Sequence, residues 1–322
     1  KKEGNETVGV IILGLIYSVN MGHLIIPALV LILVVGILAN GFIIGIIYTN
    51  SSLKNPKNIL ISHLCLIDLV GLAFSPYFIT RLAMGSTAPI SLESCLVQYY
   101  FLNLYSCVAV FMVSFMAIDR FLVICYPFLY ELKVSNENIH KFMFLCWSLA
   151  IIYPTLYIFP FIGSKVCYLV TSYSFLCTGS SIESSACNPD TILFSKYYRI
   201  VMIALHFIGS LLIVTCSYIK ILQESRSARL SESSRKALNT VVTHGIILLV
   251  FFGNSCFMFI TGSLQIRDPS EESVLAILRL TADVLYLNVP PAINPIIYGL
   301  RNEDMRREFT KFFWRKKTNL VK

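Results

Sequence analysis

The sequence predicts an all-α membrane protein, a bundle of seven transmembrane helices followed by a short amphipathic helix. Two observations lead to this fold class. Of the 322 residues, 56% are hydrophobic and only 14% are charged, whereas soluble globular domains carry about 25% charged residues. Apolar runs of about 20 residues, the length that crosses a bilayer, occur seven times. Because lipid offers no hydrogen bonds to an open backbone, each run is expected to be a helix.

Two charged residues, Asp68 and Asp283, lie within these runs, and an ionisable side chain at membrane depth is expected to have a function. Residues 8–17 are also apolar, but about ten residues do not cross a bilayer. No cleavage-like site follows them as it would follow a signal peptide. The predicted spans are residues 23–48, 58–80, 96–118, 142–162, 200–219, 240–264 and 280–298.

The basic residues predict how the chain crosses the membrane, because basic segments stay in the cytosol. Of the 26 Lys and Arg residues, 18 lie in four segments, 49–57, 120–141, 220–236 and 301–322. We therefore expect a multi-pass plasma-membrane protein with an extracellular N-terminus at 1–22 and a seven-helix domain at 23–298. A cytosolic amphipathic helix and tail follow at 299–322. The sequon at Asn5 then lies outside the cell and is expected to be glycosylated.

The net charge of +8 reflects this topology and contact with anionic membrane lipid. The basic residues are dispersed along the cytosolic rim, and no nucleic-acid-binding motif accompanies them. Nucleic acid is therefore not expected as a partner.

The most specific motif ends the third span, where the chain reads Met116-Ala-Ile-Asp-Arg-Phe-Leu-Val-Ile-Cys-Tyr-Pro127. The acid–base pair Asp119-Arg120 at the edge of a membrane helix is costly unless it has a function. The stretch resembles the MAxDRxxAICxPL signature of odorant receptors, a branch of the rhodopsin-like seven-helix receptors. It departs at Phe121, where the family usually has Tyr, and at Tyr126, where the family usually has His.

A second motif ends the seventh span, where residues 287–302 read LNVPPAINPIIYGLRN. Each proline removes a backbone donor and clashes with the preceding turn. The sequence thus predicts a broken polar turn in which Asn294 and Tyr298 offer partners to the freed carbonyls. The motif resembles the family's PPxxNPIIYSLRN, with Gly299 in place of Ser. Residues 302–314 then mix phenylalanines with basic residues, which is typical of a helix on the inner membrane surface.

A third motif enters the sixth span, where residues 234–244 read SRKALNTVVTH. It resembles the family's KAFSTCxSH, with Lys236 and His244 in place. Two roles remain open for His244, a switch or a buried histidine that bridges helices.

Single positions extend the resemblance along the chain. The family's positions in helices one, four and five are held by Asn40, Trp147 and Tyr218. The helix-two pattern LHxPMYxFLxxLSxxD ends here at Asp68 and has Lys57-Asn58 where the family has Met-Tyr. The resemblance implies that Asp68 shares a sodium or proton site with Asn294. Ala109 stands where odorant receptors commonly carry an acid on helix three, so the alternative is a hydrogen-bonded or protonated Asp68 without sodium.

The ten cysteines divide between the helices and the predicted outer side. Six are expected to pack as small apolar residues, namely Cys65, Cys107, Cys125, Cys146, Cys216 and Cys256. The other four, Cys95, Cys167, Cys177 and Cys187, face an oxidising compartment, which suggests two disulfides in one of three pairings. Their spacing lacks the short cysteine pairs of zinc sites, so no metal is expected. The resemblance to odorant receptors implies the pairs Cys95–Cys177 and Cys167–Cys187.

The resemblance implies a receptor that binds a small odorant and activates a heterotrimeric G protein of the stimulatory olfactory type, which raises cAMP. It implies no cofactor and no enzymatic activity. A rhodopsin-like receptor for another small-molecule or lipid ligand is the alternative. A transporter is disfavoured because no internal repeat is visible, and an enzyme because no nucleophile–base pair is indicated. The residues expected to act in coupling or switching are Asp119, Arg120, Tyr218, Lys236, His244, Asn294, Pro295 and Tyr298.

Helical spacing from Arg120 places one face of helix three opposite helices five, six and seven, in the outer half of the bundle. That face holds no acid, and Leu102 stands where amine receptors carry Asp, so an amine ligand is disfavoured. Near the rim, Arg199 is expected to pair with Asp283 or to attract a carboxylate. We expect a neutral or weakly polar odorant, held chiefly by Asn103, Ser106 and His206. The predicted ligand residues are Leu102, Asn103, Ser106, Cys107, Val110, Met202, Ile203, His206, Phe252, Ser255, Phe259, Val284 and Asn288.

Overall fold

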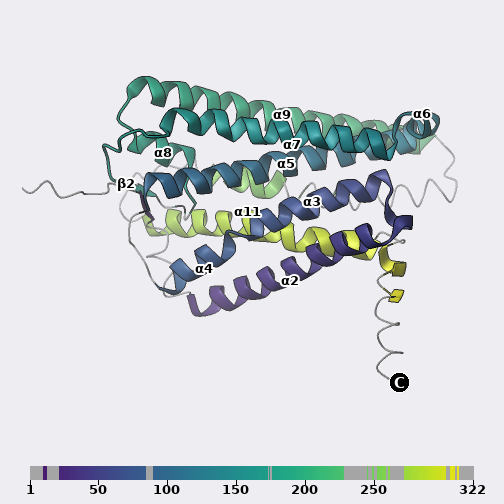
Figure 1. The fold of residues 1–322 in the computed structure, drawn as a ribbon, viewed down its shortest axis with the longest axis horizontal. Coiled ribbons are helices and arrows are strands. Elements are labelled where there is room, and N and C mark those ends of the chain that lie inside the picture. The colour runs from purple at the N-terminus through teal and green to yellow at the C-terminus, as the bar shows by residue number, and fades with distance from the viewer. Residues whose placement is uncertain are drawn as a thin grey trace, which may run out of the picture.

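The described part of the chain is a bundle of long helices that lie side by side along one axis (Figure 1). Six of the described helical segments are long and apolar enough to cross a membrane, which confirms the predicted all-α membrane fold. The computed structural model describes residues 10–12, 22–84, 90–172, 174, 176–227, 245, 249, 252–258, 260–261, 272–301, 305–308 and 310–311.

The predicted spans correspond to helices of the structure. The sixth span, 240–264, is described only at residues 245, 249, 252–258 and 260–261, all of which are helical. The remaining spans are α2 (Gly22–Thr49), α3 (Pro56–Leu72) with α4 (Ser75–Ala83), α5 (Leu92–Cys125), α7 (Asn136–Ile158), α9 (Pro189–Ser227) and α11 (Glu272–Arg301). Short 3-10 turns, η2 (Ser51–Leu53) and η3 (Phe159–Phe161), follow α2 and α7.

Polar residues just before the helices set where several of them begin. A side-chain oxygen at the N-cap accepts a hydrogen bond from a backbone N–H of the first turn, which otherwise has no partner. Among the described residues, caps of this kind are Asn55 before α3, Ser91 before α5, Ser135 before α7, Thr178 before α8 (Gly179–Ser185) and Asn188 before α9.

Proline has opposite consequences in the second and seventh spans. The second span divides after Leu72, because Pro76 lacks the N–H that the Leu72 carbonyl needs in a continuous helix. The broken turn predicted in the seventh span is wrong, since α11 continues through its three prolines. Pro295 leaves the Pro291 carbonyl without a helical donor, and the Asn40 side-chain amide of α2 donates to that carbonyl at 2.8 Å. A neighbouring helix therefore supplies the missing hydrogen bond, in place of the expected Asn294 and Tyr298.

Short elements distinguish the two ends of the bundle (Figure 1). At one end, called the α8 end, lie β2 (Val170–Ser172) and the helix α8 (Gly179–Ser185). Strand β1 (Val10–Ile12) pairs with β2 in parallel, so part of the apolar stretch 8–17 packs as a strand on this end. At the opposite end, called the α6 end, the helix α6 (Pro127–Lys133) follows α5.

Helix α5 forms the centre of the bundle, where it packs against α3, α7 and α9. Val108 and Met112 of α5 are fully buried. The outward faces of α2, α7 and α9 instead expose large apolar side chains such as Leu38, Phe144 and Leu205. A soluble protein rarely exposes apolar faces of this extent, so these faces are suited to lipid.

A short helical stretch follows α11. Among its described residues, 305–308 and 310–311 are helical. Met305 is buried, while Arg306 and Arg307 are exposed. This division into an apolar and a basic side is the one predicted for the segment after the seventh span.

Candidate functional site

The acid–base pair of the third span lies at the α6 end, inside the ring of helices. Arg120 Nη2 is 2.8 Å from Asp119 Oδ2, and the two side chains are only 12% and 5% exposed. The hydroxyl of Tyr130 in α6 donates to Asp119 Oδ1 at 2.9 Å. Burial, and then the negative charge of Asp119, raise the pKa of Tyr130, so this hydroxyl remains a donor at neutral pH. Asp119 thus holds both the arginine and the α6 helix.

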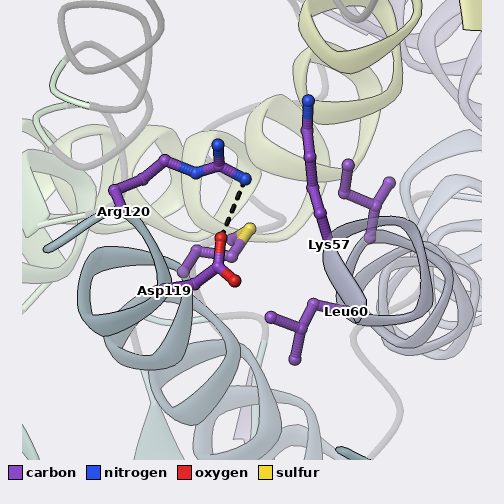
Figure 2. A pocket seen from close by; sticks show the side chains of 6 residues that line it. Lys57, Leu60, Asp119 and Arg120 are labelled. Atoms are coloured by element: carbon purple, nitrogen blue, oxygen red, sulfur yellow. Dashed lines mark ion pairs between the residues drawn. The ribbon is translucent and has the colours of Figure 1, made fainter. Parts of the chain in front are cut away.

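A hollow opens beside this pair, between α3 and α5 (Figure 2). It is shallow: the gaps between its lining atoms, counted together with open solvent, amount to about 170 Å³, and they leave no room for a water molecule. The walls combine an apolar floor with a charged rim. The lining residues are Lys57, Leu60, Ile61, Met116, Asp119 and Arg120. Lys57 was noted in the sequence only as a departure from the family, and nothing local to α3 indicates that it faces Arg120.

Helix α6 presents large apolar side chains at the same end of the bundle. Phe128 is 88% exposed and Leu132 is 78% exposed. The sequence analysis did not single out these residues, although Pro127 at the first helical position is a helix-start signal. Exposed apolar side chains next to a buried ion pair are typical of a docking surface for a protein or for lipid.

A chain of buried polar groups connects helices in the middle of the bundle. The Asn294 side-chain amide of α11 donates to Asp68 Oδ2 of α3 at 3.0 Å. Among the residues described, Asp68 Oδ1 and Asn40 Oδ1 have no hydrogen-bond partner. Ala109 is buried and offers no ligand oxygen from its side chain. The Asp68–Asn294 contact agrees with the partner that the resemblance implies.

Two tyrosines that were predicted to act in coupling or switching lie between this polar chain and Arg120. The Tyr298 hydroxyl of α11 donates to the Met116 sulfur of α5 at 3.3 Å. The Tyr218 hydroxyl of α9 is buried and has no partner among the described residues. Pro295 lies in the middle of α11. Lys236 and His244 lie outside the described residues, as does the sequon residue Asn5.

At the α8 end, one disulfide fastens the long loop between η3 and α9, residues 162–188, to α5, and a second disulfide closes the loop on itself. Cys95 is joined to Cys177 and Cys167 to Cys187, with Cα–Cα distances of 5.4 and 5.2 Å. This is the pairing that the resemblance implies. The other six cysteines are free thiols. The backbone N–H of Cys177 also donates to the Gln98 side chain at 2.8 Å, so the loop follows α5 closely.

Charged residues fasten the loop in a way that the sequence analysis did not predict. Arg199 pairs with Glu183 of α8 and not with Asp283 as expected. The Tyr157 hydroxyl donates to the same carboxylate at 3.0 Å. Asp283 accepts a hydrogen bond of 2.6 Å from the Ser174 hydroxyl of the loop. The reason for the difference is α8, a short helix that places Glu183 directly against Arg199.

The three polar residues expected to hold a ligand already have distinct surroundings. The Asn103 side-chain amide donates to the Tyr99 carbonyl of its own helix at 2.7 Å. Ser106 accepts from the Tyr286 hydroxyl of α11, also at 2.7 Å. His206 has its ring centroid 4.6 Å from that of Phe111, and its Nε2 atom has no partner among the described residues. Of the three, His206 therefore keeps a buried polar atom that a ligand can use.

The other predicted ligand residues are mostly buried between the helices. Leu102, Cys107 and Val110 of α5 are buried, and so are Phe252 and Asn288. The side-chain carbonyl oxygen of Asn288 accepts a hydrogen bond from the Ser75 hydroxyl, so this oxygen is already engaged within the bundle. Three residues are partly buried, namely Met202, Ser255 and Val284. Ile203 keeps 39% of its surface exposed, and Phe259 lies outside the described residues.

Known proteins similar to this chain agree on one kind of molecule. A family model described as the 7 transmembrane receptor (rhodopsin family) matches residues 39–298. Olfactory receptor 5M3 of Homo sapiens is 28% identical over 270 residues, which cover 83% of each chain. Olfactory receptor 4B1 of Homo sapiens is 28% identical over 294 residues, 88% of this chain and 87% of the other. Olfactory receptor 4B13 of Mus musculus is 28% identical over 292 residues, 87% and 88% of the two chains.

Proposed function

Because the chain belongs to the rhodopsin family of seven-transmembrane receptors, we propose that it detects a small odorant and activates a stimulatory heterotrimeric G protein, which raises cAMP. Its similarity to olfactory receptors confirms the resemblance predicted from its motifs. It is a multi-pass membrane protein. The α8 end, where β1 pairs with β2, then faces the outside of the cell, and the α6 end faces the cytosol.

The observation that carries the proposal is the Asp119–Arg120 pair with the hollow beside it. A buried arginine held by the acid next to it in the chain can exchange that partner for another without leaving its helix. When the helices separate at the cytosolic end, the hollow widens and Arg120 becomes available to the C-terminal helix of a G-protein α subunit. Phe128 and Leu132 of α6 offer that partner an apolar surface next to the opening.

The odorant is proposed to bind in the outer half of the bundle, beneath the loop that the Cys95–Cys177 disulfide holds in place. His206 supports this placement, because its unpartnered Nε2 lies among aromatic rings that pack well against a small ligand. A ligand shifts the receptor only if it binds the active arrangement more tightly than the resting one. Movement between α5, α9 and α11 reaches the cytosolic end through Asp68, Asn294 and Tyr298.

The test is a ligand screen in cells that express the chain with a stimulatory olfactory α subunit, read out as cAMP. A broad panel of volatile and water-soluble small molecules is applied, and cells without the chain serve as the control. We expect at least one compound to raise cAMP in a dose-dependent way. A chain that reaches the surface and responds to no compound, or that signals only through a different α subunit, would contradict the proposal.

A further inference from the structure

A series of hydrogen bonds connects strand β2 of the outer loop to the helices below it. The Ser172 hydroxyl of β2 donates to the Ser174 carbonyl at 3.0 Å, and the Ser174 hydroxyl donates to Asp283 of α11 at 2.6 Å. The backbone N–H of Leu176 donates to the same Ser174 hydroxyl at 3.1 Å. Cys177 follows and is joined to α5 by its disulfide. We call β2 together with Ser174, Leu176 and Cys177 the cover segment, because it contacts both α5 and α11.

The cover segment lies at the outer end of the helices that carry the proposed odorant site. The Cys177 backbone N–H donates to Gln98 of α5. At about 1.5 Å per residue, Ser106 lies about 12 Å deeper than Gln98 along the same helix. On α11, Tyr286 contacts Ser106 about one turn deeper than Asp283, which binds the cover segment. A water-soluble molecule that comes from outside the cell therefore passes the cover segment before it reaches the depth of Ser106.

The N-terminal strand β1 supplies the strand partner of the cover segment. The two strands run in parallel, with Val10 opposite Val170 and Ile12 opposite Ser172. In the part of the chain that the structure describes, β2 pairs with no other strand. An isolated pair of strands is only marginally stable in water, and weakly held elements open locally while the core stays folded. β1 can therefore separate from β2 while the helices remain packed.

The pairing also connects two sides of the bundle. Along the chain β1 precedes α2, whereas β2 belongs to the loop between η3 and α9. Figure 1 shows α2 on the side of the bundle opposite α7 and α9. When β1 is paired, the cover segment is held from the α2 side as well as by α5 and α11. When β1 separates, the Cys95–Cys177 disulfide still holds one end of the segment, and its β2 end is released.

We propose that the N-terminal strand β1 controls access to the interior of the bundle from outside the cell. Access is closed while β1 pairs with β2 and opens when the two strands separate. Separation frees Ser172, which positions Ser174 on Asp283, so the cover segment moves away from α11 while it stays attached at Cys177. The proposal rests on the function proposed above, because the site that it covers is the proposed odorant site, and it adds the element that admits the ligand.

The test measures how fast a charged, membrane-impermeant methanethiosulfonate reagent labels Cys107, which lies next to Ser106 and is 3% exposed. The full-length receptor is held in phosphatidylcholine nanodiscs, and mass spectrometry follows each cysteine separately. Cys146 of α7, also 3% exposed, reports any general loosening of the bundle. Ile11→Pro removes a backbone donor from the middle of β1. It is expected to speed Cys107 labelling about tenfold, if the pairing contributes on the order of one net backbone hydrogen bond. Labelling of Cys146 should not change. Ile11→Val keeps the backbone N–H and is the matched control, with rates like those of the unmodified receptor.

A second variant tests the opposite direction. Val10→Cys combined with Val170→Cys places two thiols at paired positions of the strands, and the disulfide between them should slow Cys107 labelling several-fold relative to Val170→Cys alone. Equal rates at Cys107 in Ile11→Pro and in the unmodified receptor overturn the proposal, and so does equal acceleration at Cys107 and Cys146. Two new cysteines that do not link, or that link without slowing Cys107, also overturn it. The labelling needs neither an odorant nor a G protein. The control of access can therefore fail while the proposed function stands, and the cAMP screen can fail while the control of access stands.

Discussion

Arg199 of α9 holds Glu183 of α8 through two parallel hydrogen bonds, from Nε to Oε1 and from Nη2 to Oε2, each 2.9 Å long. The contact closes over the end of α7, where the Tyr157 hydroxyl donates to Glu183 and to the Gly179 carbonyl. Such a bidentate contact fixes the relative orientation of the two side chains in addition to stabilising the pair. It fixes the orientation of the long loop over the proposed odorant site.

The first prediction concerns this pair. Glu183→Gln leaves Arg199 largely buried without its counter-ion, and removing one partner of a fully buried pair costs roughly 3–5 kcal/mol. Because Arg199 keeps 22% of its side chain exposed, we expect a smaller loss of about 1–3 kcal/mol in the free energy of unfolding. The measurement is the thermal midpoint of the purified receptor, which should fall by several degrees. Glu137→Gln, in the exposed pair with Lys141, is the control and should leave the midpoint unchanged.

The second prediction concerns coupling. Arg120→Ala is expected to abolish the odorant-driven rise in cAMP, because it removes the cation that the α subunit meets. Surface expression should remain measurable, since the helix itself is held by apolar packing. Surface labelling and cAMP are measured in the same cells. Normal signalling by a well-expressed Arg120→Ala variant would falsify the role given to this residue.

The third prediction separates the charge of Asp119 from its shape. Asp119→Asn removes the charge that holds Arg120 and keeps an oxygen that accepts from the Tyr130 hydroxyl. We expect basal cAMP to rise several-fold at equal surface expression, because a hydrogen bond to a charged group stabilises the resting pair by about 1.5–3 kcal/mol. Tyr130→Phe keeps the ion pair and should change basal cAMP much less. Equal basal activity in all three receptors would show that the pair does not hold the resting state.

The fourth prediction concerns the ligand site and uses an agonist identified in the screen. His206→Ala should reduce agonist potency more than Asn103→Ala, because the Asn103 amide is already engaged with the Tyr99 carbonyl. The measurement is the agonist concentration for half-maximal cAMP, corrected for surface expression. If Asn103→Ala and His206→Ala both keep the potency of the unmodified receptor, the proposed pocket is wrong.

The fifth prediction tests the hydrogen bond between helices at the same depth. Ser106→Ala and Tyr286→Phe each remove one partner of the 2.7 Å contact between α5 and α11. The double variant should therefore cost no more than either single variant, with a coupling energy of about 1 kcal/mol. Thermal stability and agonist potency are measured for all four receptors. Additive losses would show that the two hydroxyls act independently.

Much of the fold follows from composition and local pattern. The apolar runs predicted the membrane helices, and the match of 39–298 to the receptor family agrees with the motifs around Arg120 and Asn294. Local rules were less reliable where a distant residue intervenes. Pro295 does not break α11, because the Asn40 side chain supplies the hydrogen bond that this proline removes.

The candidate site was predictable only in part, for the same reason. The Asp119–Arg120 pair is adjacent in sequence, so its contact is local and the motif alone points to it. Arg199 was expected to meet Asp283 or a ligand, yet it meets Glu183. No periodic pattern in the loop predicted the seven-residue helix α8 that brings Glu183 there.

By itself the sequence determined the membrane class, the approximate spans, the family and the ionic motif at the end of α5, because these depend on neighbours along the chain and on the length that lipid requires. Only the tertiary structure decided that Lys57 lines the hollow beside Arg120, that Asn40 completes α11, and that Ser106 is engaged by Tyr286. Such contacts join residues on different helices. They depend on how the helices are rotated and displaced against one another, which packing of the whole bundle sets and no single segment encodes.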